Sequence, residues 1–144
     1  MTTIAYKDGI ISSDTQLTWG NEKHYTRKIS ELPRTGIVIA CAGTARHERR
    51  AHEIFNDPGW KSMDLSEKAK DFSALLFIDN ELYLLTGNYI PIPITDNYIA
   101  IGSGAAYAIA AMSLGCSAKD SIKVASKFDI NTNELTEDYE LSKE

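Results

Sequence analysis

Cysteine and basic residues are scarce in this sequence, and long hydrophobic runs are absent from it. Cys41 and Cys116 are the two cysteines among 144 residues, too few for a disulfide-rich scaffold or a cysteine-based metal site. No stretch approaches the roughly 18 consecutive apolar residues of a membrane-spanning helix. The short apolar run after Met1 is interrupted by Lys7 and Asp8, which argues against a secretory signal. We therefore expect a single domain over residues 1–144, located in the cytoplasm, with both thiols free.

Positive charge is in deficit. The sequence has 15 Lys and Arg against 20 Asp and Glu, a formal net charge of −5. Because binding to phosphates needs a basic surface, this composition argues against a nucleic-acid partner. Of the three histidines, His47 and His52 are five positions apart, one more than the i,i+4 spacing of a helical metal pair. The sequence therefore predicts no metal site.

Short β-rich segments and a few helical patterns make up the rest of the chain. Asp8-Gly9 between two β-rich runs is a strong hairpin signal, and Ser117 with Asp120 resembles a helix-capping box. Residues 15–25 are polar and aromatic, with a turn expected at Gly20-Asn21. The predicted strands are residues 3–7, 10–14, 26–32, 37–41, 74–78, 81–86, 98–101 and 136–141, and the predicted helices are residues 45–55, 66–71, 105–114 and 117–127. Antiparallel hairpins with segregated helices indicate the α+β class.

The N-terminus carries the residue types of an N-terminal nucleophile. Thr2 is small enough to permit removal of Met1, which would leave a free α-amine beside the Thr2 hydroxyl. An α-amine, with an ordinary pKa of about 7.7–8.0, can take the proton of that hydroxyl. A protonated lysine nearby would lower the pKa of the amine, and a carboxylate would hold the lysine; Lys28 and Asp14 supply these types. Taken alone, the pattern also fits a frayed terminus, a turn-forming aspartate and a solvated lysine.

Five segments in order add a family resemblance. They are MTTIAYKDGIISSDTQLTWGN, TRKI, IACAGTA, AIGSGAAYAIAA and KFDINTN. Together they resemble the proteasome β-subunit family along nearly the whole chain, and specifically its HslV-type threonine peptidases. The resemblance implies the Ntn-hydrolase fold, a four-layer αββα sandwich of two antiparallel sheets between helical layers.

The resemblance also implies a role for ten residues. The catalytic set would be Thr2 as nucleophile, Asp14 and Lys28 as its support, Gly43 as the oxyanion-hole donor, Ser103 near the amine, and Asp129 with Thr132, where the family has a late Asp-x-x-Ser. The substrate-binding set would be Cys41, Thr26 and Ser30. Read without the family, Gly43 is a helix-entry glycine, Ser103 a turn serine and Cys41 a core residue. No cofactor is implied beyond a structural monovalent cation near Asp129 and Thr132.

The function implied is that of a threonine-type endopeptidase, the proteolytic subunit of a self-compartmentalised protease. Such a subunit forms a homo-oligomeric hexameric ring or double ring and degrades unfolded protein. The sequence has no phosphate-binding loop, so a separate AAA+ unfoldase is expected. The nearly all-apolar segment 105–114 favours assembly, since a monomer would leave part of it uncovered. Two alternatives stay open: a catalytically silent scaffold subunit, and an Ntn amidase that acts on small amides.

Overall fold

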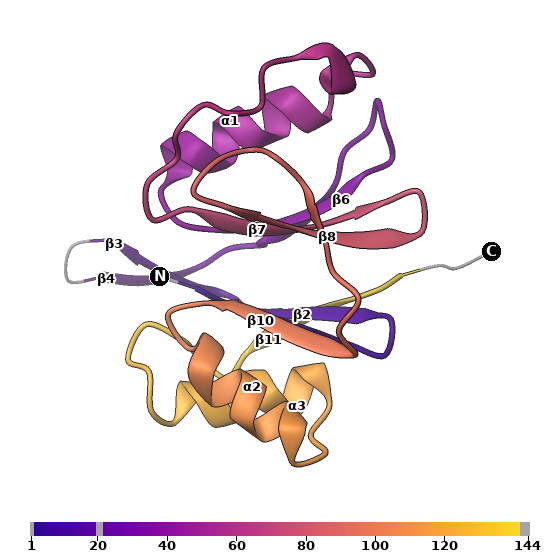
Figure 1. Cartoon of the computed structure of the whole chain (residues 1–144). Helices are drawn as coiled ribbons and strands as arrows, with labels where there is room; N and C mark the ends of the chain where they lie inside the picture. The colour runs from indigo at the N-terminus through magenta and orange to yellow at the C-terminus, as the bar shows by residue number, and fades with distance from the viewer. Residues whose placement is uncertain (1, 20–21, 142–144) are drawn as a thin grey trace. The chain divides into compact units, whose positions relative to one another are not determined.

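The fold is of the α+β class (Figure 1), as the sequence predicts. A computed structural model describes residues 2–19 and 22–141. The chain divides into two compact units, one of residues 1–28 with 96–144 and one of residues 29–95. The expectation of a single domain over residues 1–144 stays a prediction. Within the described ranges, no helix combines the length and the hydropathy that crossing a bilayer requires.

The first unit is built on an antiparallel sheet in which the N-terminal strand is central. The sheet has the order β10-β1-β2-β11 and consists of β1 (Thr3–Lys7), β2 (Ile10–Asp14), β10 (Tyr98–Gly102) and β11 (Thr136–Glu140). Asp8 and Gly9 join β1 to β2 with φ values of 52° and 80°, as a two-residue hairpin turn requires. This confirms the predicted hairpin. It also places the segment that begins at Thr3 between two strands, where it cannot fray.

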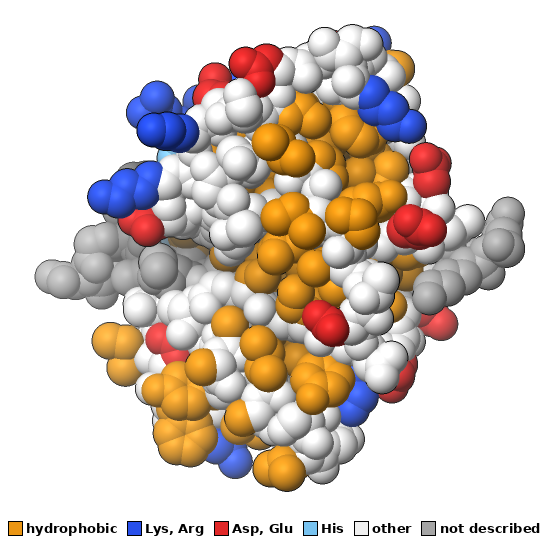
Figure 2. Space-filling model, in the orientation of Figure 1, with side chains coloured by type: hydrophobic (Ala, Val, Ile, Leu, Met, Phe, Trp, Pro, Cys, Tyr) orange, Lys and Arg blue, Asp and Glu red, His pale blue; other side chains and the backbone are white. Residues whose placement is uncertain are grey.

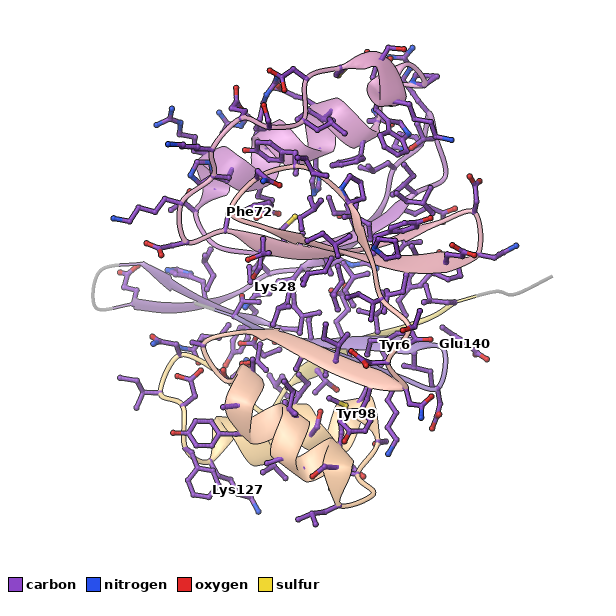
Figure 3. The ribbon with its side chains drawn as sticks, in the orientation of Figure 1. Tyr6, Lys28, Phe72, Tyr98, Lys127 and Glu140 are labelled. Carbon is purple, nitrogen blue, oxygen red and sulfur yellow. The ribbon has the colours of Figure 1, made fainter. Side chains whose placement is uncertain are left out.

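Two helices, α2 (Ala105–Ser113) and α3 (Ala118–Ser126), cover one face of this sheet (Figure 1). Lys7 of β1 fixes the end of α2, because its Nζ donates to the carbonyls of Met112 and Cys116 at 3.3 and 2.9 Å. The same Nζ lies 5.9 Å from the ring centroid of Tyr98, which Figure 3 labels. The core between sheet and helices is small-residue rich and consists of Ala5, Ala100, Ala108, Met112, Ala118 and Ile122.

Helix α2 is only half covered, as its composition predicts. Ala108, Ala111 and Met112 are buried, whereas Tyr107 is 42% exposed and Ile109 39%. Hydrophobic side chains accordingly gather on the outer surface of α2 and of the segment after α3 (Figure 2), where Tyr107 stacks on Phe128 at 5.3 Å between ring centroids. The capping prediction for α3 is confirmed, because the Asp120 N–H donates to Ser117 Oγ at 3.1 Å.

The second unit is a five-stranded antiparallel sheet with one helix on it. Its order is β5-β6-β7-β8-β9, and its elements are β5 (Ile29–Glu31), β6 (Val38–Ala42), α1 (Ala45–Phe55), the 3₁₀ turn η1 (Trp60–Ser62), β7 (Ser73–Ile78), β8 (Glu81–Thr86) and β9 (Ile92–Pro93). Helix α1 contributes Ala51, Ile54 and Phe55 to the core of this unit.

Two local predictions differ from the structure, and one region holds strands that were not predicted. Residues 66–71 are not helical, because Asp64 bonds to the N–H and hydroxyl of Ser66 and forms a turn that competes with a helix. The strand predicted over residues 26–32 is confined to β5, since the N–H of Lys28 donates to the Glu137 side chain instead of a neighbouring strand. Residues 15–25 form a hairpin of β3 (Gln16–Trp19) and β4 (Glu22–Tyr25); the turn expected at Gly20-Asn21 lies outside the described residues.

Candidate active site

The structure brings Asp14 and Lys28 together as a buried ion pair. Asp14 ends β2 and is fully buried, and Lys28, labelled in Figure 3, lies between β4 and β5 with 6% of its side chain exposed. Lys28 Nζ donates to Asp14 Oδ1 at 2.8 Å. The same oxygen accepts the N–H of Thr3 at 3.1 Å, while Oδ2 accepts the backbone N–H groups of Gln16 and Asn133 at 3.4 Å. These donors and the ammonium together stabilise an ionised carboxylate away from water.

A second cluster forms around Asp129, after the end of α3. Ser103 Oγ and Thr132 Oγ1 both donate to Asp129 Oδ2, at 2.5 and 2.7 Å, and the N–H of Asn131 donates to Oδ1 at 3.1 Å. Partial burial raises the pKa of Asp129, but these hydrogen bonds outweigh it and hold that pKa below its ordinary value. The three residues that the resemblance selected here therefore form one bonded group.

The peptide group between Thr2 and Thr3 is hydrogen-bonded to both clusters. Its carbonyl accepts the N–H of Ser103 at 2.8 Å, which ties it to the Asp129 cluster. The next N–H along the chain, that of Thr3, donates to Asp14 and so ties it to the ion pair. Thr2 is 7% exposed, and its hydroxyl makes no hydrogen bond to any residue that the structure describes. Among the described residues, the hydroxyl of the predicted nucleophile is therefore not held by another side chain or backbone group.

The glycines on either side of Ser103 make this approach possible. A Cβ on Gly102, whose φ is +95°, would lie 1.7 Å from the carbonyl oxygen of Thr2. A Cβ on Gly104 would lie 2.3 Å from Thr3 Oγ1. Neither distance is compatible with a side chain. The Gly-Ser-Gly motif is therefore explained by the close passage of the N-terminal strand.

Three predicted residues, Ser30, Cys41 and Gly43, belong to the other compact unit. Gly43 follows β6 with φ +142°, and a Cβ there would lie 3.1 Å from the carbonyl of Asp71. It is exposed, and its N–H donates to no residue within the described ranges. Burial raises the pKa of the Cys41 thiol well above its ordinary value, and the negative charge of Glu48 adds a smaller increase. Because the thiolate is the reactive form, this raised pKa makes the thiol unreactive. The roles assigned to these three residues stay predictions.

Two cavities adjoin the candidate site within the first unit, and one of them includes predicted residue Thr26. It measures about 420 Å³ and is lined by Thr15, Tyr25, Thr26, Arg27, Leu135 and Glu137. The other measures about 460 Å³ and is lined by Tyr25, Ser126, Lys127, Thr132, Asn133, Glu134 and Leu135. Thr26 therefore lines a cavity, as a substrate-binding residue should, although that role stays a prediction.

Two residues that organise the site, Thr3 and Glu137, were not among those predicted from the sequence. Thr3 is bonded to both clusters, and the Thr-Thr repeat at the N-terminus was its only signal. Glu137 of β11 accepts the N–H of Lys28 at 2.9 Å and pairs with Arg27 at 2.6 Å, so it fixes the segment that carries the lysine. Nothing in the sequence marked it, because the contact depends on how β11 pairs with β2.

Comparison with known proteins reveals the fold. No family profile matches the sequence. Among solved structures, BPH of Thiobacillus denitrificans is similar over 99% of both chains, with a TM-score of 0.69 and 19% identity; its complex with epoxomicin gives 0.71 and 19% over the same shares. HslV of Trypanosoma brucei gives a TM-score of 0.68 and 18% identity, again over 99% of both chains.

The chain has the HslV-type fold. At these identities the likeness is one of fold. In this chain, the central strand of one sheet starts immediately after Thr2, and both polar clusters meet the start of that strand.

Proposed function

We propose that this chain is a threonine peptidase of the HslV-type, proteasome β-subunit family, with Thr2 as its nucleophile after removal of Met1. The observation that carries the proposal is the position of Thr2. Its carbonyl is bonded to Ser103 of the Asp129 cluster, and the following N–H is bonded to Asp14 of the buried pair with Lys28. The shared fold supports it, as does the complex of BPH, one of the similar structures, with epoxomicin.

The chemistry follows from one residue with two functional groups. The α-amine of Thr2 takes the hydroxyl proton while Oγ1 attacks the carbonyl carbon of a peptide bond. The amine then gives that proton to the departing nitrogen, which leaves an ester between substrate and Thr2. The same amine deprotonates a water molecule that hydrolyses the ester and restores the hydroxyl. Lys28, oriented by Asp14, would supply positive charge beside the reacting oxygen.

The other predicted residues would assist this reaction. The exposed N–H of Gly43 would donate to the oxyanion, and the Asp129 cluster would orient the amine of Thr2. Cys41, Thr26 and Ser30 would contact the substrate side chain. A structural monovalent cation beside Asp129 and Thr132 stays a prediction; both oxygens of that carboxylate already accept hydrogen bonds from the protein.

The assembly is part of the proposal. The four-stranded sheet, the five-stranded sheet and the helices α1, α2 and α3 would form the four-layer αββα sandwich of Ntn hydrolases. Such subunits would associate into a hexameric ring or a double ring, with a separate AAA+ unfoldase delivering unfolded protein in the cytoplasm. The exposed apolar side chains on α2 and on the segment after α3 support association, because patches of this kind commonly mark protein contacts.

Intact mass spectrometry with epoxomicin tests the function directly. We expect the purified protein to lack Met1, to hydrolyse peptides and to gain one epoxomicin mass on Thr2. Thr2→Ala should abolish both hydrolysis and labelling, whereas Thr86→Ala, at an exposed threonine of β8, should change neither. Active protein that retains Met1 would refute the proposed nucleophile. Absence of both activities would favour the silent scaffold, and cleavage of small amides without cleavage of unfolded protein would favour the amidase.

A further inference from the structure

The residue after the proposed nucleophile, Thr3, has an unusual set of contacts for a strand residue. It is fully buried, yet its N–H and its hydroxyl together make three hydrogen bonds within the site. Its N–H donates to Asp14 Oδ1 at 3.1 Å. Its hydroxyl oxygen accepts the N–H of Gly104 at 3.0 Å and lies 2.7 Å from Thr132 Oγ1, so the hydroxyl is an acceptor in one bond and can be the donor in the other. Thr3 is thus bonded to both polar clusters.

Counting protons fixes the direction of these bonds. Each hydroxyl has one proton, and Thr132 uses its own to donate to Asp129 Oδ2 at 2.7 Å. The 2.7 Å contact between Thr3 and Thr132 must therefore be donated by Thr3. The result is one directed chain, from the N–H of Gly104 through Thr3 and Thr132 to the carboxylate of Asp129. Chains of this kind strengthen each of their bonds, because each donor is polarised by the next.

We propose that Thr3 is a positioning residue: its hydroxyl and N–H together fix the backbone of Thr2 between the Asp129 cluster and the Asp14–Lys28 pair. This inference rests on the proposed function. It adds that the reactive hydroxyl and amine of Thr2 are aligned by the second threonine of the Thr-Thr start. Misplacement of a reacting group by about 1 Å can cost about 100-fold in rate, so such a tie has catalytic value.

Thr3→Val tests the role of the hydroxyl, because valine keeps the branched shape and removes only the polar group. The variant leaves the buried N–H of Gly104 without an acceptor and Thr132 without its donor. We expect kcat to fall about tenfold or more, with KM unchanged, since the substrate pocket is not altered. Thr3→Ser restores the hydroxyl and should recover most of the lost kcat. The rate of labelling of Thr2 by epoxomicin should change in parallel.

Ser12→Ala is the matched control. Ser12 is also fully buried in the same sheet, and its hydroxyl donates to a carboxylate, that of Asp138, at 2.6 Å, but it is bonded to neither cluster. It should lose stability to a similar degree and keep the wild-type kcat. The unfolding midpoints of both variants in urea separate a loss of stability from a loss of alignment.

The outcomes separate this inference from the proposed function. Inactive wild-type protein would refute the proposed function, and the positioning role with it. Active wild type with an unchanged kcat in folded Thr3→Val would refute the positioning role alone. The same holds if Thr3→Ser fails to restore kcat. If Thr3→Val does not fold, Thr3→Ala replaces it, and failure of both to fold would make the hydroxyl a structural requirement and overturn the inference.

Discussion

Removal of the Lys28 ammonium should affect stability and catalysis separately, and the structure allows the two to be distinguished. In Lys28→Met, the Asp14 carboxylate remains fully buried and loses its counter-charge. Breaking a buried ion pair in this way costs about 3–5 kcal/mol, and the 6% and 0% exposure of the two side chains leaves little solvent screening to reduce that cost. A domain is stable by about 5–15 kcal/mol, so the variant should fold but denature earlier.

The expected size of the effect can be measured by unfolding. For a chain of this length, a loss of 1 kcal/mol lowers Tm by about 2–4 °C, so a loss of about 3–5 kcal/mol predicts a decrease of about 6–20 °C. The double variant Asp14→Asn with Lys28→Met removes both charges and keeps an acceptor for the N–H of Thr3. It should recover much of the stability, with a coupling energy of about 2–3 kcal/mol between the two sites.

Catalysis should not recover with stability. If Lys28 acts on the Thr2 hydroxyl, both the single and the double variant lack the required positive charge, and neither should turn over peptide. Lys28→Arg should not rescue turnover either, because the planar guanidinium is too large for the place of the buried ammonium. The reasoning is refuted if the double variant regains turnover together with stability, or if Lys28→Met unfolds at the wild-type urea midpoint.

Three further predictions concern separate parts of the molecule. Burial raises the pKa of Cys41, so in the native protein at pH 8 a thiol reagent should modify the partly exposed Cys116 and leave Cys41 intact until urea is added; equal rates would contradict this. The pKa of Asp129 is lower in the folded protein than its ordinary value of 3.8, so this group stabilises the fold at pH values above 3.8. That stability is lost as the pH falls through the pKa of the folded state. Ser103→Ala removes one of the bonds that depress it, so acid unfolding should shift to higher pH, and an unshifted midpoint would show that Ser103 has no part in it. Tyr107→Glu puts a charge on the exposed face of α2 and should reduce the mass seen by light scattering; a wild-type protein that is already monomeric would remove the proposed assembly.

Local sequence signals predicted those parts of the fold that depend on neighbouring residues. The hairpin at Asp8-Gly9 and the cap of α3 at Ser117 each need only a few consecutive residues. The error over residues 66–71 has the same origin, since the helical pattern ignored the competing turn at Asp64. The prediction of a single strand over residues 26–32 failed because a contact from β11, more than 100 positions away, satisfies the backbone at Lys28.

The site was predicted through resemblance, and its physical cause became visible only with the fold. The contact between Asp14 and Lys28 was expected from the chemistry of an N-terminal nucleophile, whereas Ser103, Asp129 and Thr132 were identified by the resemblance alone, without any indication of their contacts. The structure joins them into two bonded groups because β1 lies between β2 and β10. Strand order of this kind depends on pairing between distant segments, which no local pattern reports.

Gly102 shows how strongly that pairing constrains the site, and it yields a test with an internal control. Gly102 and Gly115 have similar φ values, +95° and +103°, so alanine at either position should be strained by about 1–2 kcal/mol. At Gly115 no described residue other than its chain neighbours lies within 4 Å of the added Cβ, whereas at Gly102 the Cβ would lie 1.7 Å from the carbonyl oxygen of Thr2. Gly102→Ala must therefore displace Thr2 from Ser103, although every proposed catalytic side chain is still present. We expect both variants to lose a similar amount of strain-related stability in urea, with an additional loss and little peptide hydrolysis in Gly102→Ala alone. Equal activity of the two variants would mean that the position of the Thr2 backbone does not govern the reaction.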